Sequence, residues 1–253
     1  MCRIVKQTNH WRNIYVFTTE HFIWLGLCAI FVALLTYISK KFNFSLKTAG
    51  YIMCAICAVS EISKIMSDMM ESEMGGMFLD PKSLPFHLCS LMIFAVLFIT
   101  FGKDGKAKQT IIDFVAVMGT LGSICALLIP TNGTDFTKIL AYQCFVYHAG
   151  LLYFSLYLIV GGYARLGKAL GKNMLVLLSL VWAMIYVNSA LSQYDTNFMY
   201  LVRPPMENLP FLTLDYGWYV YFLHILSLGA LIIALFHLPF IIRDKKAARA
   251  NKP

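Results

Sequence analysis

The residues best suited to chemistry in this chain are histidines and a cysteine that stand within long apolar segments. His87 and Cys89 are two positions apart, and His148 lies in a later apolar segment. A thiolate activated by an imidazole attacks carbonyl groups, and an imidazole alone can take a proton from a hydroxyl. Ionisable side chains in such segments usually face a cavity or one another. We therefore predict that His87, Cys89 and His148 are the catalytic residues of a buried polar site.

Several further polar residues in or beside the apolar segments are candidates for substrate binding. They are Glu61, Ser90, Asn188, Tyr194 and His224. An amide, a phenol or a second histidine could stabilise a developing oxyanion by donating hydrogen bonds to it. Structural alternatives stay open: Glu61 could pair with Lys64 three residues along a helix, and Asn188 or His224 could bond between helices. A zinc site built from histidines and Glu61 is a further alternative, although we expect no metal.

The apolar segments are long enough to span a membrane. Hydrophobic residues make up 59 % of the 253-residue chain, charged residues make up 13 %, and mean hydropathy is +0.67. Segments of roughly 17 to 26 residues can cross a hydrocarbon layer of about 30 Å as helices. Lipid offers no hydrogen-bond partners, so the backbone N–H and C=O groups must bond to one another, as they do in a helix. We predict an all-α, polytopic membrane bundle, a single domain over residues 1–253. Its seven transmembrane helices are expected at about 22–38, 48–66, 84–101, 111–129, 139–161, 174–192 and 217–242.

Charges in the loops predict how the bundle is oriented. Residues 39–47, 102–109 and 164–173 hold three Lys or Arg each, and the tail from Arg243 holds five, which makes 14 of the 21 basic residues. The opposite loops are mainly acidic. Because basic loops stay in the cytoplasm, the N-terminus is predicted outside and the C-terminus inside, although Arg3, Lys6 and Arg12 disagree. The basic residues are scattered over short loops, so we expect no nucleic-acid partner.

This orientation places the candidate residues in the outer half of the bundle. At ~1.5 Å per residue, His87 and His148 lie within about 14 Å of the outer surface on different spans, so we predict a polar cavity open to that side. His87 and Cys89 project about 200° apart around a helix, so a cysteine–histidine pair would form between helices, for example Cys89 with His148. If Cys89 faces away, His87 could act directly as a base. In the inner half, Asp113 and His237 are expected close to water.

Three stretches of the sequence resemble the YwaF family of bacterial integral membrane proteins, which is related to the transmembrane protein 164 family. They are Leu84-Pro85-Phe86-His87-Leu88-Cys89, Tyr147-His148, and Asn188 followed by Asn197-Phe198-Met199-Tyr200-Leu201, Pro204 and Tyr216-Gly217-Trp218-Tyr219. Their order and spacing agree with that family over roughly residues 50–240. By position, His87 and His148 correspond to its histidines, and Cys89 corresponds to its bacterial cysteine. The resemblance implies a multi-pass protein of the bacterial plasma membrane.

The same resemblance implies a function in lipid metabolism, because the transmembrane protein 164 family resembles phospholipid acyltransferases. We predict acyl transfer between membrane phospholipids, which are the expected partners. No cofactor is expected, since an outer site has no access to cytoplasmic acyl-CoA. The alternative is a non-enzymatic seven-helix transporter or ligand-binding protein with a polar cavity in its outer half. The two halves of the chain do not look alike, which counts against an inverted-repeat transporter.

Overall fold

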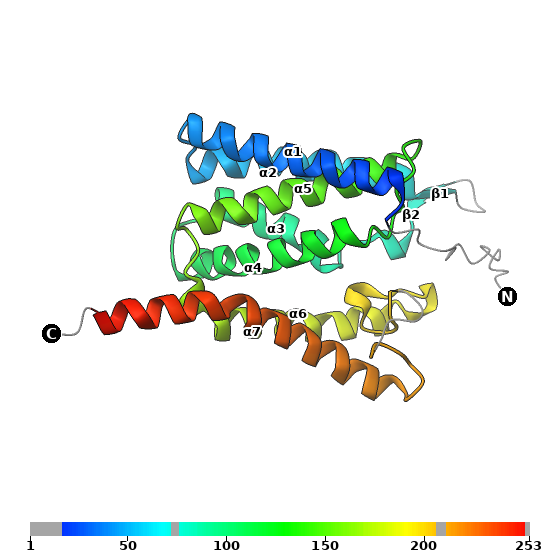
Figure 1. Ribbon diagram of the computed structural model, residues 1–253. Coiled ribbons are helices and arrows are strands. Elements are labelled where there is room, and N and C mark those ends of the chain that lie inside the picture. The colour runs from blue at the N-terminus through cyan, green and yellow to red at the C-terminus, as the bar shows by residue number, and fades with distance from the viewer. Residues whose placement is uncertain (1–16, 72–75, 206–210, 251–253) are drawn as a thin grey trace.

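The computed structural model describes residues 17–71, 76–205 and 211–250, which contain seven α-helices (Figure 1). These are α1 (Thr19–Lys41), α2 (Leu46–Asp68), α3 (Leu88–Phe101), α4 (Lys106–Leu128), α5 (Ile139–Val160), α6 (Leu166–Ala190) and α7 (Trp218–Ala250). All of them except α3 are long and apolar enough to cross a membrane. The predicted all-α class is confirmed, apart from a small antiparallel hairpin of β1 (Met69–Glu71) and β2 (Met77–Leu79) that follows α2.

The first two helices begin at capping residues. Thr18 precedes α1, and its hydroxyl accepts the backbone N–H of His21 at 3.2 Å. Ser45 precedes α2, and its hydroxyl accepts the backbone N–H of Thr48 at 3.1 Å. The first turn of a helix has backbone donors without helical partners, so these side chains fix where each helix begins.

Helices α4 and α5 form the centre of the bundle. α5 packs against α1, α2 and α4, while α4 also contacts α3 and α6. Figure 1 shows α1, α2 and α5 together, with the α6–α7 pair on the opposite side of α4. Small residues permit close contact: a Cβ atom at Gly150 of α5 would lie 2.9 Å from Ile56 of α2. Close approach over small residues is a common basis of helix association in membranes.

The third apolar segment begins later than the sequence predicts. The expected span starts at residue 84, but α3 starts at Leu88 and has 14 residues, which is about 21 Å of helix. Leu84 and His87 both have extended backbone angles, and Pro85 disfavours the helical conformation for the residue before it. His87 is therefore the N-cap residue of α3 and lies outside the helix, so helix geometry does not set the direction of its side chain.

The seventh helix is longer than predicted. α7 has 33 residues, about 50 Å of helix, and it continues past the expected end at residue 242 to Ala250. The basic residues Arg243 and Arg249 of the tail are therefore helical. A helix of this length extends beyond a hydrocarbon layer of ~30 Å, so its last turns lie outside the lipid.

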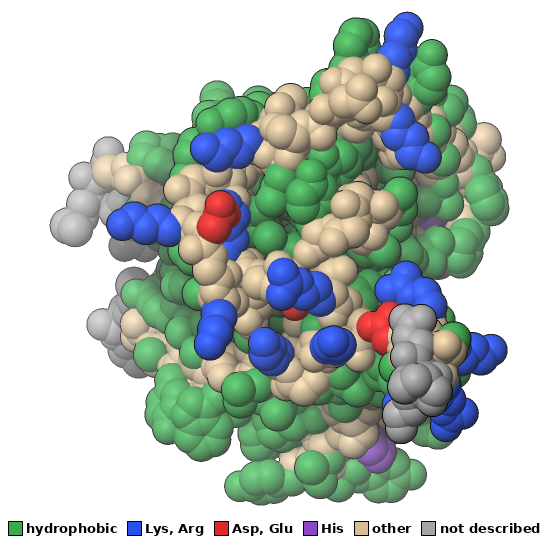
Figure 2. Space-filling view, turned by 90° about the vertical axis from the view of Figure 1, so that its left-hand side faces the viewer, with side chains coloured by type: hydrophobic (Ala, Val, Ile, Leu, Met, Phe, Trp, Pro, Cys, Tyr) green, Lys and Arg blue, Asp and Glu red, His purple; other side chains and the backbone are tan. Residues whose placement is uncertain are grey.

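The two ends of the bundle differ in charge. Figure 2 views the end that carries the α1–α2, α3–α4 and α5–α6 links and the C-terminal part of α7, where Lys and Arg side chains gather. We call it the basic end. The opposite end, which carries β1, β2 and the connection from α6 to α7, is called the hairpin end. The alternation of links between the two ends agrees with the predicted order of spans, while Arg3, Lys6 and Arg12 lie outside the described residues.

Candidate functional site

The connection from α6 to α7 is held in place by two asparagines. Asn188, near the end of α6, accepts the backbone N–H of Phe198 at 2.8 Å and donates to the Phe198 carbonyl at 3.0 Å. Asn197 accepts the backbone N–H groups of Val202 and Arg203 at 3.0 and 3.1 Å. Both amides are thus used to fix residues 197–203, which we call the 197–203 loop.

Charged and aromatic side chains at the hairpin end strengthen this attachment. Two guanidinium nitrogens of Arg203 lie 2.6 and 2.9 Å from the carboxylate oxygens of Asp195. The hydrogen bonds from Arg203 hold the pKa of Asp195 below its usual range. From α7, the Trp218 indole donates to the Leu201 carbonyl at 2.9 Å. The 197–203 loop is therefore tied both to the end of α6 and to the start of α7.

The 197–203 loop presents two aromatic rings to His87. Met199 and Tyr200 have φ of 55°, a left-handed conformation that non-glycine residues rarely adopt. The Tyr200 carbonyl accepts the hydroxyl of Tyr221 on α7, which helps to hold the turn. The centroids of the Phe198 and Tyr200 rings lie 5.5 and 5.3 Å from that of the His87 ring. His87 is therefore seated against two aromatic rings by a loop that is fixed to two helices.

His148, on α5, has one ring nitrogen engaged. Its Nδ1 is 2.7 Å from the carbonyl oxygen of Cys144, one turn earlier. A carbonyl oxygen only accepts, so Nδ1 carries the proton and Nε2 carries the lone pair. In the described chain no hydrogen bond reaches Nε2, and the enclosed side-chain N and O atoms without a partner there are Ser123 Oγ and Asn173 Oδ1. Nε2 therefore has a lone pair that no described group uses, and this is the protonation state that a general base needs.

Tyr147 brings α5 against the first turn of α3. Its hydroxyl donates to the Cys89 carbonyl at 2.5 Å, and its ring lies edge-on to the neighbouring His148 ring with centroids 5.1 Å apart. His148 is thus one residue from the contact that joins α5 to the segment containing His87 and Cys89. The segment that contains His87 and Cys89 therefore contacts the helix that contains His148. Among the described residues, however, no hydrogen bond joins the two histidine rings directly.

The Cys89 thiol lies against α4. Its sulfur is 3.5 Å from the position of a Cβ atom at Gly122, and no hydrogen bond connects it to a histidine in the part of the chain that the structure describes. The sulfur beside His148 belongs to Cys144 and is 3.6 Å from Nδ1. The hydrogen-bonded pair of Cys89 and His148 suggested by the sequence is therefore not formed in this structure. Its formation depends on how α3 is rotated, which helix periodicity alone does not fix.

Two of the predicted binding residues lie on the elements next to His87. Glu61 forms an ion pair with Lys64 at 2.8 Å on α2, with both side chains largely buried. This is the local pair that the sequence allowed as an alternative. Helix α2, which carries this pair, contacts the short turn Pro81–Ser83 that precedes His87. Ser90 is half-buried in the first turn of α3, so a hydroxyl, a carboxylate and an ammonium group are placed around this segment.

The other three predicted binding residues lie elsewhere. The amide of Asn188 is engaged by the backbone of Phe198 and acts as a positioning group. Tyr194 is exposed at the hairpin end. His224 is exposed on α7, where its Nδ1 lies 2.8 Å from the Phe211 carbonyl. Similar depth along a helix therefore did not bring His224 to the region of the other two histidines.

A metal centre finds no support in the described part of the chain. Within residues 17–71, 76–205 and 211–250, no three His, Cys, Asp or Glu side chains are grouped so that they could hold a metal ion. The geometry of the described residues therefore does not support the alternative of a zinc site.

Comparison with known proteins decides the family. The model of the TMEM164 family matches residues 16–238, which include every predicted site residue. The chain belongs to the TMEM164 family. No curated protein and no solved structure matches it. This TMEM164 family member is thus a membrane protein with several apolar helices, consistent with a multi-pass location.

Sequence reasoning did not foresee the aromatic surroundings of the histidines in this TMEM164 family protein. Tyr147 joins α5 to α3, and Phe198 and Tyr200 form the seat of His87. Tyr147 adjoins His148 in the sequence, and the two rings of the seat lie in the run Asn197–Leu201. A tyrosine next to a histidine in an apolar helix could have indicated a role for Tyr147 near the site. Its contact with α3 depends on tertiary packing, which the sequence pattern does not give.

A second polar cluster of this TMEM164 family protein lies near the basic end. Asp113 of α4 was expected to lie close to water, but it is almost fully buried. Its carboxylate accepts the side-chain amide of Gln109 at 3.0 Å and the backbone N–H of Arg165 at 2.7 Å. Arg165 is the N-cap residue of α6, so Asp113 supplies the acceptor that the start of this helix lacks.

His237 of α7 completes the cluster at the basic end and is fully buried. Its Nδ1 donates to the Leu166 carbonyl at 2.7 Å, and its Nε2 accepts the side-chain N–H of Asn173 at 3.1 Å. The same Asn173 nitrogen donates to the Asp113 carbonyl at 3.2 Å. Both nitrogens of His237 are engaged, so this histidine joins α7 to α6 and has no lone pair left for catalysis.

Proposed function

We propose that this protein transfers acyl chains between membrane phospholipids, with His148 as the general base. The observation that carries the proposal is the His148 tautomer, in which the Cys144 carbonyl holds the proton on Nδ1 and leaves the lone pair on Nε2. Tyr147 places this ring beside the segment that contains His87. Membership of the TMEM164 family supports the proposal, since the resemblance of that family to phospholipid acyltransferases implies the same chemistry.

The position of Cys89 favours direct transfer over an acyl-enzyme. In the direct route, Nε2 of His148 removes the proton from a lipid hydroxyl, whose oxygen attacks the ester carbonyl of a second phospholipid. The tetrahedral intermediate expels the original alcohol, which takes the proton from the imidazolium, so the acyl donor leaves as a lysophospholipid. The Cys89 sulfur lies against Gly122, and in the described part of the chain no hydrogen bond joins it to a histidine that could activate it.

Tyr200 is the group that we assign to the oxyanion. Burial raises the pKa of Tyr200, so its hydroxyl stays protonated at neutral pH and can donate a hydrogen bond. Its ring lies beside His87, within the same aromatic seat. A donor that is already oriented stabilises the charge that develops on the ester oxygen during attack.

The proposal is tested with the purified full-length chain in vesicles that contain a labelled phospholipid and an unlabelled lysophospholipid, without coenzyme A. We expect labelled acyl chains to appear on the acceptor. Cys89→Ala should retain transfer if His148 activates the hydroxyl directly, and loss of transfer in a folded Cys89→Ala protein would favour an acyl-enzyme. Failure of every lipid pair, with saturable binding of a small ligand that depends on the same histidines, would support the transporter or ligand-binding alternative instead.

We further propose that the hairpin end faces outward across a bacterial plasma membrane, with the N-terminus outside and the C-terminus inside. The gathering of Lys and Arg at the basic end supports this orientation. Cysteines placed at Lys41 and Lys106 should react only with membrane-permeant thiol reagents in intact cells. Labelling of either position by an impermeant reagent would reverse the orientation and put the site on the cytoplasmic side.

A further inference from the structure

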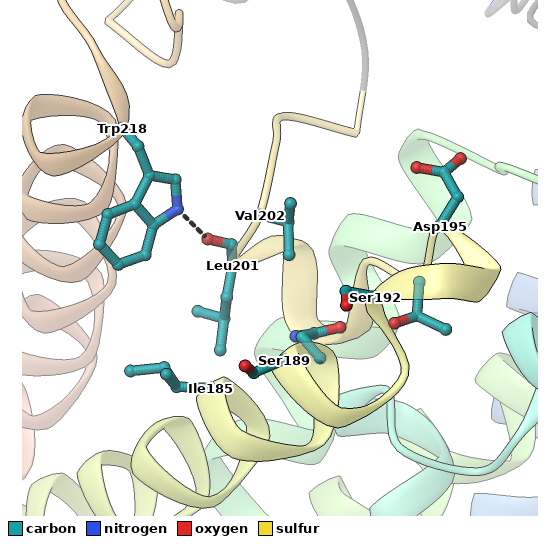
Figure 3. A pocket seen from close by; sticks show the side chains of 9 residues that line it. Ile185, Ser189, Ser192, Asp195, Leu201, Val202 and Trp218 are labelled. Atoms are coloured by element: carbon teal, nitrogen blue, oxygen red, sulfur yellow. Dashed lines mark hydrogen bonds between the residues drawn. The ribbon is translucent and has the colours of Figure 1, made fainter.

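A cavity of about 310 Å³ lies between the end of α6, the 197–203 loop and the first turn of α7. Figure 3 shows that Ile185 and Ser189 line the cavity from α6, Leu201 and Val202 line it from the loop, and Trp218 lies at one side on α7. Neither His87 nor His148 lines this cavity. It is therefore a separate space at the hairpin end.

The walls of the cavity have two chemical characters. Ile185, Leu201 and the Trp218 ring form an apolar side. Ser189 and Ser192 form a polar side, and in the described part of the chain no protein group hydrogen-bonds to their hydroxyls. A space that offers both apolar contact and hydroxyl groups, beside a Trp at the end of an apolar helix, suits the interfacial part of a lipid.

The charge around the cavity favours an anionic group. The Asp195 carboxylate lines the space, but Arg203 holds it through two hydrogen bonds and Lys82 lies 3.5 Å away. Among the described residues, Asp195 therefore has two cationic partners. A cationic head group would compete with Arg203 for Asp195, whereas a phosphate would use the positive charge that remains.

The size of the cavity indicates how much of a lipid it holds. A volume of about 310 Å³ has room for roughly ten water-sized groups, which is about the size of a glycerophosphate unit. Two acyl chains do not fit in the same space. They would leave the cavity along the apolar side, past Ile185 and toward the lipid-facing surface of α6 and α7.

We propose that this cavity binds the glycerophosphate part of a membrane phospholipid, at a site separate from the two histidines. The hydroxyls of Ser189 and Ser192 donate to the phosphate, and Arg203 and Lys82 supply the charge. The 197–203 loop forms a wall of the cavity through Leu201 and also seats His87, so an occupant steadies that seat. The inference requires lipid binding and does not depend on acyl transfer.

The test measures lipid retention by native mass spectrometry of the detergent-purified full-length chain. The probe is dihexanoyl phosphatidylglycerol, compared with dihexanoylglycerol, which lacks the phosphate. Ser189→Phe fills the cavity and should weaken phosphatidylglycerol binding by roughly tenfold or more. Ser179→Phe places the same side chain on an exposed position of α6 and should change binding by less than about twofold.

Lys82→Gln provides a variant that leaves the cavity walls in place. It should weaken phosphatidylglycerol binding a few-fold, as expected for an exposed charge, and leave dihexanoylglycerol binding unchanged. Equal binding of the two probes would overturn the phosphate assignment. Binding that survives Ser189→Phe, or that never occurs, would overturn the site. The His148→Gln protein should still retain the lipid, which separates failure of this site from failure of the proposed acyl transfer.

Discussion

Two buried histidines of this protein, His237 near the basic end and His148 nearer the hairpin end, differ in how many ring nitrogens are engaged. His237 donates through Nδ1 to Leu166 and accepts at Nε2 from Asn173. His148 donates through Nδ1 to Cys144, and among the described residues nothing bonds to its Nε2. A saturated imidazole holds helices together, whereas one with an unused lone pair can take up a proton.

The polar residues around the two histidines also differ in how they are hydrogen-bonded. At the basic end, Asp113, Asn173 and His237 form one network that joins α4, α6 and α7. Toward the hairpin end, the hydrogen bonds belong to the 197–203 loop and the tyrosines, and they position the rings of His87 and His148 without saturating them. The number of polar residues in a membrane helix therefore says less about function than how fully they are bonded.

The largest effect is expected from His148→Gln, measured as acyl transfer in vesicles. Glutamine can still donate to the Cys144 carbonyl but cannot take up a proton, so transfer should fall by ~10²–10⁴-fold. His237→Gln is the matched control and should keep most of the transfer per folded molecule. Equal losses in the two variants, at equal folded fractions, would remove the distinction between the two histidines.

The next largest effect is expected from Asn188→Leu, measured as the free energy of unfolding in detergent. The change leaves the N–H and the carbonyl of Phe198 without partners, which should cost about 2 to 4 kcal/mol. Transfer should fall as well, because the 197–203 loop would no longer seat His87. Asn132→Leu, at an exposed position, is the control and should change the stability by less than about 0.5 kcal/mol. A stable Asn188→Leu protein with full transfer would show that the loop does not need this attachment.

A smaller effect is expected from His237→Leu on the free energy of unfolding. The Leu166 carbonyl would lose its donor in a buried place, which should cost about 1 to 3 kcal/mol. His224→Leu, on an exposed face of the same helix, should cost less than about 0.5 kcal/mol. Transfer per folded molecule should stay unchanged in both variants. A specific loss of transfer in His237→Leu would give the basic-end cluster a catalytic role.

The smallest effect concerns Asp195 and pH. Its pKa is lowered in the folded protein by Arg203, so its contribution to stability is fully present above the ordinary value of about 3.9 and is lost as pH falls through the lower folded pKa. The carboxylate is 64 % exposed, so the contribution should be below about 1 kcal/mol. Asp195→Asn should therefore be slightly less stable than the wild type at pH 6, and the difference should shrink as pH falls below about 3.9. A difference that does not shrink on acidification would assign the effect to packing.

The positions of the helices along the chain could be predicted from the sequence, but the rotation of each helix about its own axis could not. Hydropathy located all seven helices, and the ion pair of Glu61 with Lys64 was one of the two alternatives that the spacing left open for Glu61. The predicted start of α3 was wrong because Pro85 disfavours a helical residue before it and His87 itself has extended backbone angles, so the helix begins only at Leu88. The exposure of His224 and the direction of the Cys89 thiol toward Gly122 depend on how each helix is turned against its neighbours. In an apolar helix every face is hydrophobic, so the pattern gives little information about that rotation.

The difference between His148 and His237 can be measured as the rate at which diethyl pyrocarbonate modifies each histidine of the native protein, followed by peptide mapping. The reagent attacks an unprotonated nitrogen that it can reach. His148 should therefore react in the folded protein, whereas His237 should react only after unfolding. His21, whose two nitrogens are engaged by the Phe17 N–H and the Leu127 carbonyl, should behave like His237. Modification of His237 as fast as His148, or complete protection of His148 until the protein unfolds, would show that the lone pair of His148 is no more available than that of His237.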